Sequence, residues 1–184
     1  MSILFFAGSL RSDSCNKKFA REAQRVAKEA GIDGKYIDIK EYVIPVYDGD
    51  VEATSGLPEG VKKLSQEIQA ASALVISTPE YNGSIPGPLK NIIDWLSRDK
   101  PMPLTDKHLL LLAASPGGLG GVRSLWHTRQ PFEALGVFVF PNMMGLPRAY
   151  EAFDDQGRLK DEKTSQQLLK TLTQYAKHVR PSAV

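Results

Sequence analysis

Hydroxyl, amide and basic side chains gather in one short stretch near the amino terminus, residues 8–16 (GSLRSDSCN). Ser9, Ser14 and Asn16 can donate side-chain hydrogen bonds, and a helix that begins near Asn16 leaves its first backbone N–H groups unpaired. These N–H groups and the helix dipole favour an anion. Arg11 adds a permanent positive charge and a fork that can take two phosphate oxygens. Together these groups predict a site for a phosphomonoester.

Two later stretches combine glycine and proline with little side-chain bulk. Residues 78–88 (TPEYNGSIPGP) place the ring of Tyr81 beside a tight Asn-Gly turn, and residues 115–118 (SPGG) present backbone with no side chains in the way. Such loops suit a flat, largely uncharged heterocycle that is bound by main-chain groups. A phosphate at one loop and a planar ring at the other two describe a mononucleotide.

The stretch 73–98 shows how such a loop is positioned. It opens with an apolar run, ALVIS, that is typical of a buried strand. It ends with four apolar residues at the helical spacing i, i+3, i+4 and i+7: Leu89, Ile92, Ile93 and Leu96. The three prolines and two glycines between them can continue neither element. A loop of this kind lies at the carboxyl edge of a parallel sheet, where open α/β sheets bind their ligands.

The rest of the chain repeats this alternation of strand and helix. The predicted strands are residues 2–8, 35–39, 73–77, 109–115 and 137–140. The predicted helices run from near Asn16 to a stop at Gly31, and over residues 61–71, 89–96, 122–135 and 168–179. Pro131 is expected to kink or divide the fourth helix. Residues 45–58 and 143–157 are expected to be loops.

Five strands that alternate with five helices predict one architecture. Such alternation requires parallel strands joined by right-handed crossovers, so we expect a doubly wound, five-stranded parallel sheet with helices on both faces. The common strand order 2-1-3-4-5 places the switch point between the first and third strands. The loops after the first, third and fourth strands should therefore converge.

Composition and charge exclude several classes of protein. The net charge is +2 with both signs interspersed, so neither a nucleic-acid nor a membrane surface is expected. The longest apolar runs are far shorter than the ~20 residues that span a bilayer, and no secretory signal opens the chain. The single cysteine, Cys15, excludes an internal disulfide and fits a reducing compartment. We expect one domain, residues 1–184, in the cytoplasm.

Three motifs in this order resemble the NAD(P)H-dependent FMN reductase family, which includes bacterial quinone, azo-dye and chromate reductases. They are GSLR-x-x-S-x-N after the first strand, PEYNGSIPG-x-LKN-x-IDWLSR after the third and SPGG after the fourth. The match covers nearly the whole chain. The resemblance implies a flavodoxin-like fold, noncovalent FMN, and hydride transfer from NAD(P)H through FMN to a small acceptor such as a quinone, a flavin, an azo compound or a metal oxyanion.

The resemblance also implies which residues contact FMN. The phosphate would be held by Ser9, Arg11, Ser14 and Asn16, and Cys15 between them is placed with the cofactor contacts. The isoalloxazine would be lined by Pro79, Glu80, Tyr81, Asn82, Gly83 and Ser84. Its other edge would be closed by Ser115, Gly117 and Gly118. The backbone of Glu80 is the expected contact, while its side chain is left to bond locally or across a subunit boundary. No catalytic residue and no metal ligand is assigned, because the cofactor carries the chemistry.

Two other motif interpretations fail on particular residues. Cys15 and Arg21 match the C-x5-R pattern of phosphotyrosine phosphatases, but the residues between them lack the glycines that curl backbone around a phosphate. A helix N-terminus would lower the pKa of the Cys15 thiol somewhat, although a small, half-buried thiol is the preferred interpretation. The run GGLGG is no dinucleotide fingerprint, because Arg123 stands where its third glycine should be.

The alternative function is a flavodoxin-like carrier of single electrons without NAD(P)H activity of its own. Flavodoxins hold the phosphate without an arginine and cover the flavin with aromatic residues from two sides. Here Arg11 is present, and the glycine-rich loop at residues 116–121 leaves the ring open to a second planar reactant. A hydride donor needs that open face, so the reductase is preferred.

Two further expectations concern the assembly and the hydride donor. Leu125, Trp126 and Phe132 are too many large apolar residues for one inward helix face, and an open flavin needs a wall, so we expect a homodimer or homotetramer. Arg123, Arg129 and Arg148 could each meet the 2′-phosphate of NADPH. The sequence alone leaves the choice between NADH and NADPH open.

Overall fold

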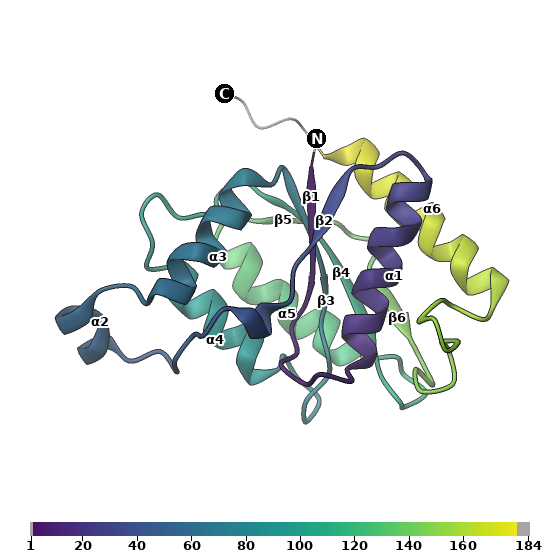
Figure 1. The fold of residues 1–184 in the computed structure, drawn as a ribbon, viewed down its shortest axis with the longest axis horizontal. Coiled ribbons are helices and arrows are strands. Elements are labelled where there is room, and N and C mark those ends of the chain that lie inside the picture. Colours follow the sequence, from purple (N-terminus) through teal and green to yellow (C-terminus); the bar gives the residue numbers. More distant parts are fainter. Residues whose placement is uncertain (1, 180–184) are drawn as a thin grey trace.

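A parallel sheet runs through the centre of the computed structural model, which describes residues 2–179 (Figure 1). Its main path has the strand order β2-β1-β3-β4-β5, and every neighbouring pair is parallel. The strands are β1 (Ile3–Ala7), β2 (Gly34–Tyr36), β3 (Ala73–Ser77), β4 (His108–Ala114) and β5 (Phe138–Val139). The predicted strand order is therefore confirmed.

Helices cover both faces of this sheet. On one face lie α1 (Cys15–Glu29) and α6 (Glu162–His178), and on the other α3 (Glu59–Ala70), α4 (Gly87–Leu96) and α5 (Val122–Ala134) (Figure 1). Alternate residues of β3 join the two cores: Leu74 and Ile76 pack with the layer of α3, α4 and α5, while Ala73 and Val75 pack with α1 and α6. Burial on both faces explains the unbroken apolar runs of the central strands. None of the helices within residues 2–179 combines the length and apolarity needed to cross a membrane.

Helix α5 runs unbroken through Pro131, so the expected division of the helix is wrong. Proline removes one backbone donor and crowds the preceding turn. Leu125 and Phe132, on either side of it, are both buried and hold the helix against the sheet. Tertiary packing therefore outweighs the local preference of proline. The same burial revises the expectation for Leu125, Trp126 and Phe132, because, of these three, only Trp126 is exposed, at 59%.

The region between β2 and α3 differs from expectation at two places. β2 ends three residues before the end of the predicted strand 35–39, because a 3-10 turn, η1 (Ile39–Glu41), begins there. Residues 45–58, expected to be a loop, contain α2 (Gly49–Ser55), which is capped by the side chain of Asp48. None of the residues of α2 is buried. The sequence of this helix therefore lacks the regularly spaced apolar residues by which a helix is predicted.

A sixth strand, β6 (Met144–Leu146), lies in the stretch 143–157 that the sequence predicts as a loop. β5 pairs with the first half of β4 and β6 with the second half, so the two short strands share one edge. Pro141 lies between them and has no N–H to donate. The pairing of β6 carries the chain on to the carboxyl edge of the sheet, where the N–H of Ala149 donates to the carbonyl of Ser115 at 3.0 Å. The predicted five-stranded sheet is thus corrected to six strands.

One buried side chain joins the ends of three elements at this edge. Asn16, in the first turn of α1, accepts hydrogen bonds at Oδ1 from the Ser77 hydroxyl and the Ala114 N–H, both at 2.8 Å. Its Nδ2 donates to the Ala114 carbonyl, also at 2.8 Å. Ser77 ends β3 and Ala114 ends β4. The start of α1 is therefore fixed to both strands.

Replacing Asn16 by alanine should lower the free energy of unfolding by about 3 kcal/mol, because three buried partner groups lose their hydrogen bonds and each unsatisfied group costs roughly 1–3 kcal/mol. Urea denaturation followed by circular dichroism measures the loss. Asn142→Ala is the control, since that amide makes one exposed contact of 3.4 Å with Gln174 and should cost less than about 0.5 kcal/mol. Equal midpoints for the two variants would show that Asn16 does not fasten the strands.

Candidate functional site

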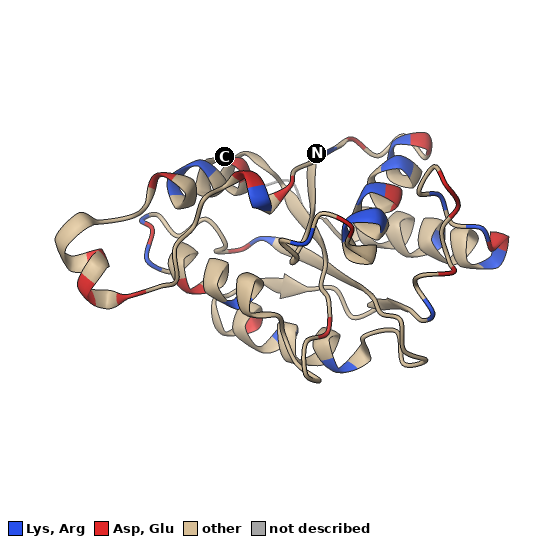
Figure 2. Cartoon of the chain, turned by 60° about the horizontal axis from the view of Figure 1, so that its bottom comes forward, with Lys and Arg blue, Asp and Glu red and all other residues tan. Residues whose placement is uncertain are grey.

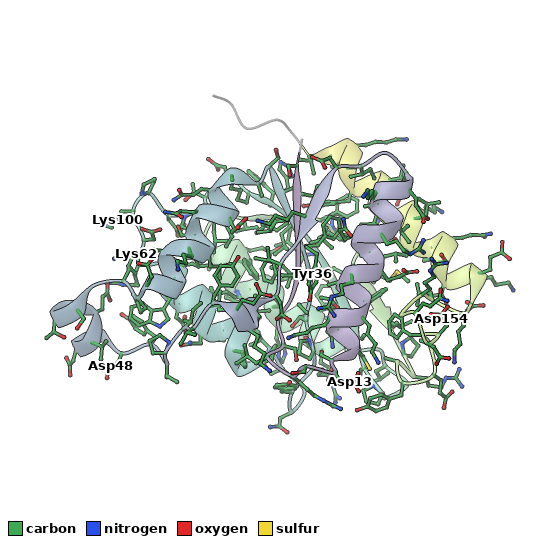
Figure 3. The ribbon with its side chains drawn as sticks, in the orientation of Figure 1. Asp13, Tyr36, Asp48, Lys62, Lys100 and Asp154 are labelled. Atoms are coloured by element: carbon green, nitrogen blue, oxygen red, sulfur yellow. The ribbon has the colours of Figure 1, made fainter. Side chains whose placement is uncertain are left out.

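The residues predicted to bind a ligand meet at the carboxyl edge of the sheet, at the lower end of the view in Figure 1; Asp13, labelled in Figure 3, belongs to the loop after β1. A cavity of about 200 Å³ lies there. Nine of the predicted residues line it: Ser9, Arg11, Ser14, Cys15, Asn16, Pro79, Glu80, Tyr81 and Ser115. Five predicted residues of the same loops lie outside it: Asn82, Gly83, Ser84, Gly117 and Gly118. Whole ligands usually need roughly 300–1,000 Å³, so this cavity accounts for one end of a mononucleotide.

Two buried hydroxyls in this cavity keep their protons available. Ser9 and Ser14 are 1% and 6% exposed. Their Oγ atoms accept hydrogen bonds from the N–H of Arg11 at 3.3 Å and of Asn16 at 3.2 Å. Neither hydroxyl donates to any atom within residues 2–179. Because buried donors are normally paired, these two protons call for an acceptor that a ligand would supply.

The charge at this end of the cavity comes from Arg11. Its side chain forms no ion pair with any described carboxylate, and its Nη1 lies 3.5 Å from the hydroxyl of Tyr150. That hydrogen bond raises the pKa of Arg11, so the guanidinium stays charged at any pH of interest. In Figure 2, segments coloured blue for Lys and Arg and red for Asp and Glu are interspersed along the chain. The arrangement suits one small, highly charged anion such as a phosphate.

Two predicted residues of the first loop, Asn16 and Cys15, also have contacts within the fold itself. Asn16 lines the cavity, but its three bonds to Ser77 and Ala114 use three of the four hydrogen-bonding positions of an amide. Asn16 therefore fixes the loop to the two strands, and one hydrogen-bonding position of its amide remains for a ligand. Cys15 is half-buried as expected, but burial raises the pKa of its thiol. The expected lowering at the helix N-terminus is outweighed.

The loop after β3 forms a tight hairpin turn. Tyr81 and Ser84 exchange backbone hydrogen bonds of 3.2 and 3.1 Å, and Asn82 and Gly83 between them have φ of 52° and 74°. Two successive positive φ values are typical of a type I′ turn, for which Asn-Gly is the preferred pair. The turn leaves the ring of Tyr81 45% exposed at the rim of the cavity. The sequence therefore specifies a turn that also presents an aromatic surface.

Glu80 joins this loop to the start of α5. The first residue before that helix, Gly121, has φ of 82° and offers no side-chain cap. Glu80 supplies the cap from another loop: its Oε2 accepts from the N–H groups of Arg123 at 3.1 Å and Ser124 at 3.4 Å, and its Oε1 accepts from Arg123 Nε at 2.8 Å. Burial alone raises the pKa of Glu80, but the bonds from Arg123 and Ser124 outweigh it and lower the pKa below its ordinary value. The sequence did not decide the role of the Glu80 side chain. In the structure it joins the loop after β3 to the start of α5, and we call this pairing the Glu80 clamp.

The glycines after β4 divide into two kinds. Gly120 and Gly121 have φ of 61° and 82°, and a Cβ on Gly121 would come within 2.9 Å of the Cβ of Ala113. These two are required by the fold. Gly117 and Gly118 are not, because neither has a positive φ and a Cβ on Gly118 would meet nothing within 4 Å. A flat ligand that approaches the backbone would explain them.

Tyr150 lines the cavity but was not among the predicted residues. It follows β6, whose pairing with β4 carries the segment beside the loop after β4. Its ring is 63% exposed and its hydroxyl faces Arg11. The sequence offers no signal for it, since the whole stretch 143–157 resembles a loop.

The chain is similar to known proteins over most of its length. A family model described as NADPH-dependent FMN reductase matches residues 1–151. The chain is 39% identical to an NAD(P)H-dependent FMN reductase from Pseudomonas aeruginosa, over 98% of this chain and 97% of that protein. It is 35% identical to a quinone reductase from Escherichia coli K12, over 98% and 96%.

Among solved structures, the flavoenzyme NAD(P)H:(acceptor) oxidoreductase FerB from Paracoccus denitrificans superposes with a TM-score of 0.81 at 26% identity, over 97% of this chain and 96% of that one. A flavodoxin from the domain Archaea superposes with a TM-score of 0.61 at 11% identity, over 97% and 99%. The second likeness concerns the fold alone.

The Glu80 clamp makes a pH-dependent prediction. Glu80→Ala should lower the free energy of unfolding at pH 7 by about 1–2 kcal/mol, because α5 loses its N-terminal cap. The folded-state pKa is depressed, so this contribution is full above the unfolded-state value of about 4.3 and disappears as the pH falls through the folded-state value. Urea midpoints of parent and variant should therefore converge in acid.

The control for that measurement is Glu133→Ala, which removes an exposed i,i+4 partner of Arg129 on the same helix. We expect it to cost less than about 0.5 kcal/mol at any pH. A difference between parent and Glu80→Ala that does not change with pH would mean that the carboxylate charge contributes nothing.

Proposed function

Because the chain belongs to the NADPH-dependent FMN reductase family, we propose that residues 1–184 form one FMN-binding domain that passes electrons from NAD(P)H to small acceptors. Quinones, flavins, azo compounds and metal oxyanions are the acceptor classes, and the name of the Escherichia coli relative favours quinones. The observation that carries the assignment of the site is the set of unused donors around the 200 Å³ cavity. We place the protein in the cytoplasm, since a chain with one thiol suits a reducing compartment.

The phosphate of FMN would bind at the start of α1. The hydroxyls of Ser9 and Ser14 would donate their free protons to it, and Arg11 would neutralise its charge through two parallel N–H bonds. The first-turn N–H groups of α1 add further donors. Asn16 would hold this loop in register with β3 and β4 through its bonds to the ends of both strands.

The isoalloxazine would lie against the two outer loops. Tyr81 and the turn that follows it would contact one side of the ring, and the glycine backbone at Gly117 and Gly118 would allow close approach on another. The N–H of Gly118 donates to no atom within residues 2–179, so it could stabilise negative charge on the ring, as the donors of an oxyanion hole do. Glu80 and Arg123 would keep the two loops at a fixed separation.

No side chain at this edge is assigned an acid–base role. When bound, FMN supplies the redox chemistry, taking electrons from NAD(P)H and passing them to the acceptor. The imidazole that α5 brings to this edge, His127, shares a hydrogen bond of 3.0 Å between its Nδ1 and Ser84 Oγ, so it braces the turn. The tasks of the chain are to bind the phosphate, orient the ring and leave one face open.

Arg11→Ala should weaken FMN binding while leaving the fold intact. A charge-assisted hydrogen bond contributes enough that its loss reduces affinity roughly 10- to 150-fold. Fluorescence titration of the apoprotein with FMN measures the change. Riboflavin, which lacks the phosphate, is the control and should bind parent and variant about equally. An unchanged FMN affinity would remove Arg11 from the site.

Donor and acceptor should use the site in alternation. The three loops at this edge form an open site for a planar ligand, and the sequence carries no dinucleotide fingerprint. Both substrates should therefore contact the same face in turn, which gives ping-pong kinetics. Anaerobic NADPH should bleach the flavin absorbance at about 450 nm, and double-reciprocal plots at several quinone concentrations should be parallel. Intersecting lines would mean that both substrates bind together. Failure of both NADPH and NADH to bleach the flavin would favour the electron carrier.

A homodimer or homotetramer is the proposed assembly. Trp126, Leu119 and Tyr81 are 59%, 64% and 45% exposed and belong to the loops and helix at the flavin edge, and an open ring needs a wall that a second copy can supply. Light scattering at micromolar concentration should report at least twice the chain mass of 20.2 kDa. A mass equal to one chain would contradict the proposal.

A further inference from the structure

The three arginines that could meet the 2′-phosphate of NADPH differ in the structure. Arg123 is bound to Glu80, and Arg129 is paired with Glu133. The guanidinium of Arg148 is exposed and forms neither an ion pair nor a hydrogen bond within residues 2–179. Of the three, only Arg148 therefore has its full charge available to a ligand.

The backbone of Arg148 is held in an unusual conformation beside the flavin site. Its φ of 48° lies in the left-handed region, which an arginine seldom adopts. Its N–H donates to the carbonyl of Gly117 at 3.4 Å, and its own carbonyl accepts from the N–H of Glu151 at 3.0 Å. Non-glycine residues in this region persist where the surroundings enforce them, and such sites concentrate at functional positions.

A second cavity adjoins the flavin site on the same segment. It has a volume of about 460 Å³ and lies between the start of α1 and the chain after β6, on the side where Asp154 is labelled in Figure 3. It shares Cys15 and Tyr150 with the flavin cavity, so these two residues form the common wall. Its other lining residues are Lys18, Ala149, Phe153, Asp154, Asp155, Gly157 and Lys160.

The other cavities are poorly placed for the same ligand. One, of about 530 Å³, lies at the amino end of β4 and includes His108 and Phe138. Another, about 210 Å³, lies between α1 and α6 and includes Arg25 and Leu169. Neither shares a lining residue with the flavin cavity. A dinucleotide whose nicotinamide lies on the flavin must extend over the adjoining surface, and the 460 Å³ cavity is the one that adjoins.

The charges that face this cavity leave cations available. Lys160 makes no ion pair or hydrogen bond through its side chain within residues 2–179, whereas Lys18 is paired with Asp13 at 2.8 Å. Asp154 is engaged by its own turn, since its Oδ1 accepts two backbone N–H bonds at 2.9 and 2.8 Å. Asp154 nevertheless keeps its negative charge, so Asp154 and Asp155 both oppose an anion here. Lys160 lines the cavity, and Arg148 directly precedes another lining residue, Ala149, so these two cations can meet one further anion.

Resting on the proposed function, we propose that this cavity binds the adenosine end of NADPH, with Arg148 and Lys160 recognising the 2′-phosphate. The protein then prefers NADPH to NADH, because only NADPH carries that group. Arg148 and Lys160 are specificity residues in this assignment. They touch neither FMN nor the nicotinamide.

Calorimetry with two small nucleotides tests this on the FMN-loaded protein. Adenosine 2′,5′-bisphosphate and adenosine 5′-monophosphate differ only in the 2′-phosphate, and the first should bind at least about fivefold more tightly. Arg148→Asn and Lys160→Gln should each reduce that preference about fivefold and lower the ratio of kcat/KM for NADPH over NADH by a similar factor. Asparagine is chosen because it tolerates a left-handed backbone. The matched control is Lys62→Gln on α3, labelled on another part of the molecule in Figure 3, which should change nothing.

The outcomes separate this inference from the proposed function. A parent protein that binds FMN and oxidises NADH but shows no preference for the bisphosphate overturns the inference alone. Retention of the preference in both Arg148→Asn and Lys160→Gln does so as well. The proposed function is overturned if the chain fails to bind FMN, or if neither NADPH nor NADH reduces the bound flavin. Melting temperatures of the variants confirm that each is folded.

Discussion

The geometry of the ligand edge depends on one buried amide. Asn16 makes three hydrogen bonds of 2.8 Å that hold the first turn of α1 against the last residues of β3 and β4. Buried polar groups at strand ends are expensive to leave unpaired, and here a single side chain satisfies a hydroxyl, an N–H and a carbonyl together. The three loops leave the sheet from these residues. Their spacing is therefore set before any ligand binds.

A second set of contacts extends this order outward. Glu80 caps α5 and pairs with Arg123, so the loop after β3 cannot move without the loop after β4. The segment after β6 is fastened to the same loop through the Ser115 and Gly117 carbonyls. The loops thus form one connected shell around groups that remain unpaired, chiefly the hydroxyls of Ser9 and Ser14. This combination of a fixed scaffold with unused donors is what a preorganised binding site requires.

The sequence predicted features that depend on a few neighbouring residues. It did not predict contacts between side chains that are far apart in the chain. The strands and the turn at Asn82 and Gly83 could be predicted because burial on both faces and positive φ each restrict residue type over a few positions. Asn16 was predicted to contact the phosphate because its side chain can donate a hydrogen bond at the start of a helix. In the structure its side chain bonds to residues that lie 61 and 98 positions further along the chain. Glu80 and Arg123 are likewise 43 apart.

Two short elements were not predicted for another reason. α2 buries no residue and β6 has only three, so neither has a hydrophobic period long enough to recognise. Although β6 is short, failing to predict it mattered for the site. Its pairing with β4 places Tyr150 at the cavity and Arg148 beside Gly117. A short strand such as β6 can thus position residues of a site although its own sequence does not predict a strand.

The division of the last sheet position between β5 and β6 also bears on aggregation. A long, regular edge strand exposes a row of free N–H and C=O groups that can template pairing with another chain. Here one edge consists of a two-residue strand and a three-residue strand separated by Pro141, and the opposite edge, β2, has three residues. Neither edge offers an uninterrupted template. The short, interrupted edges therefore disfavour the addition of a strand from another chain.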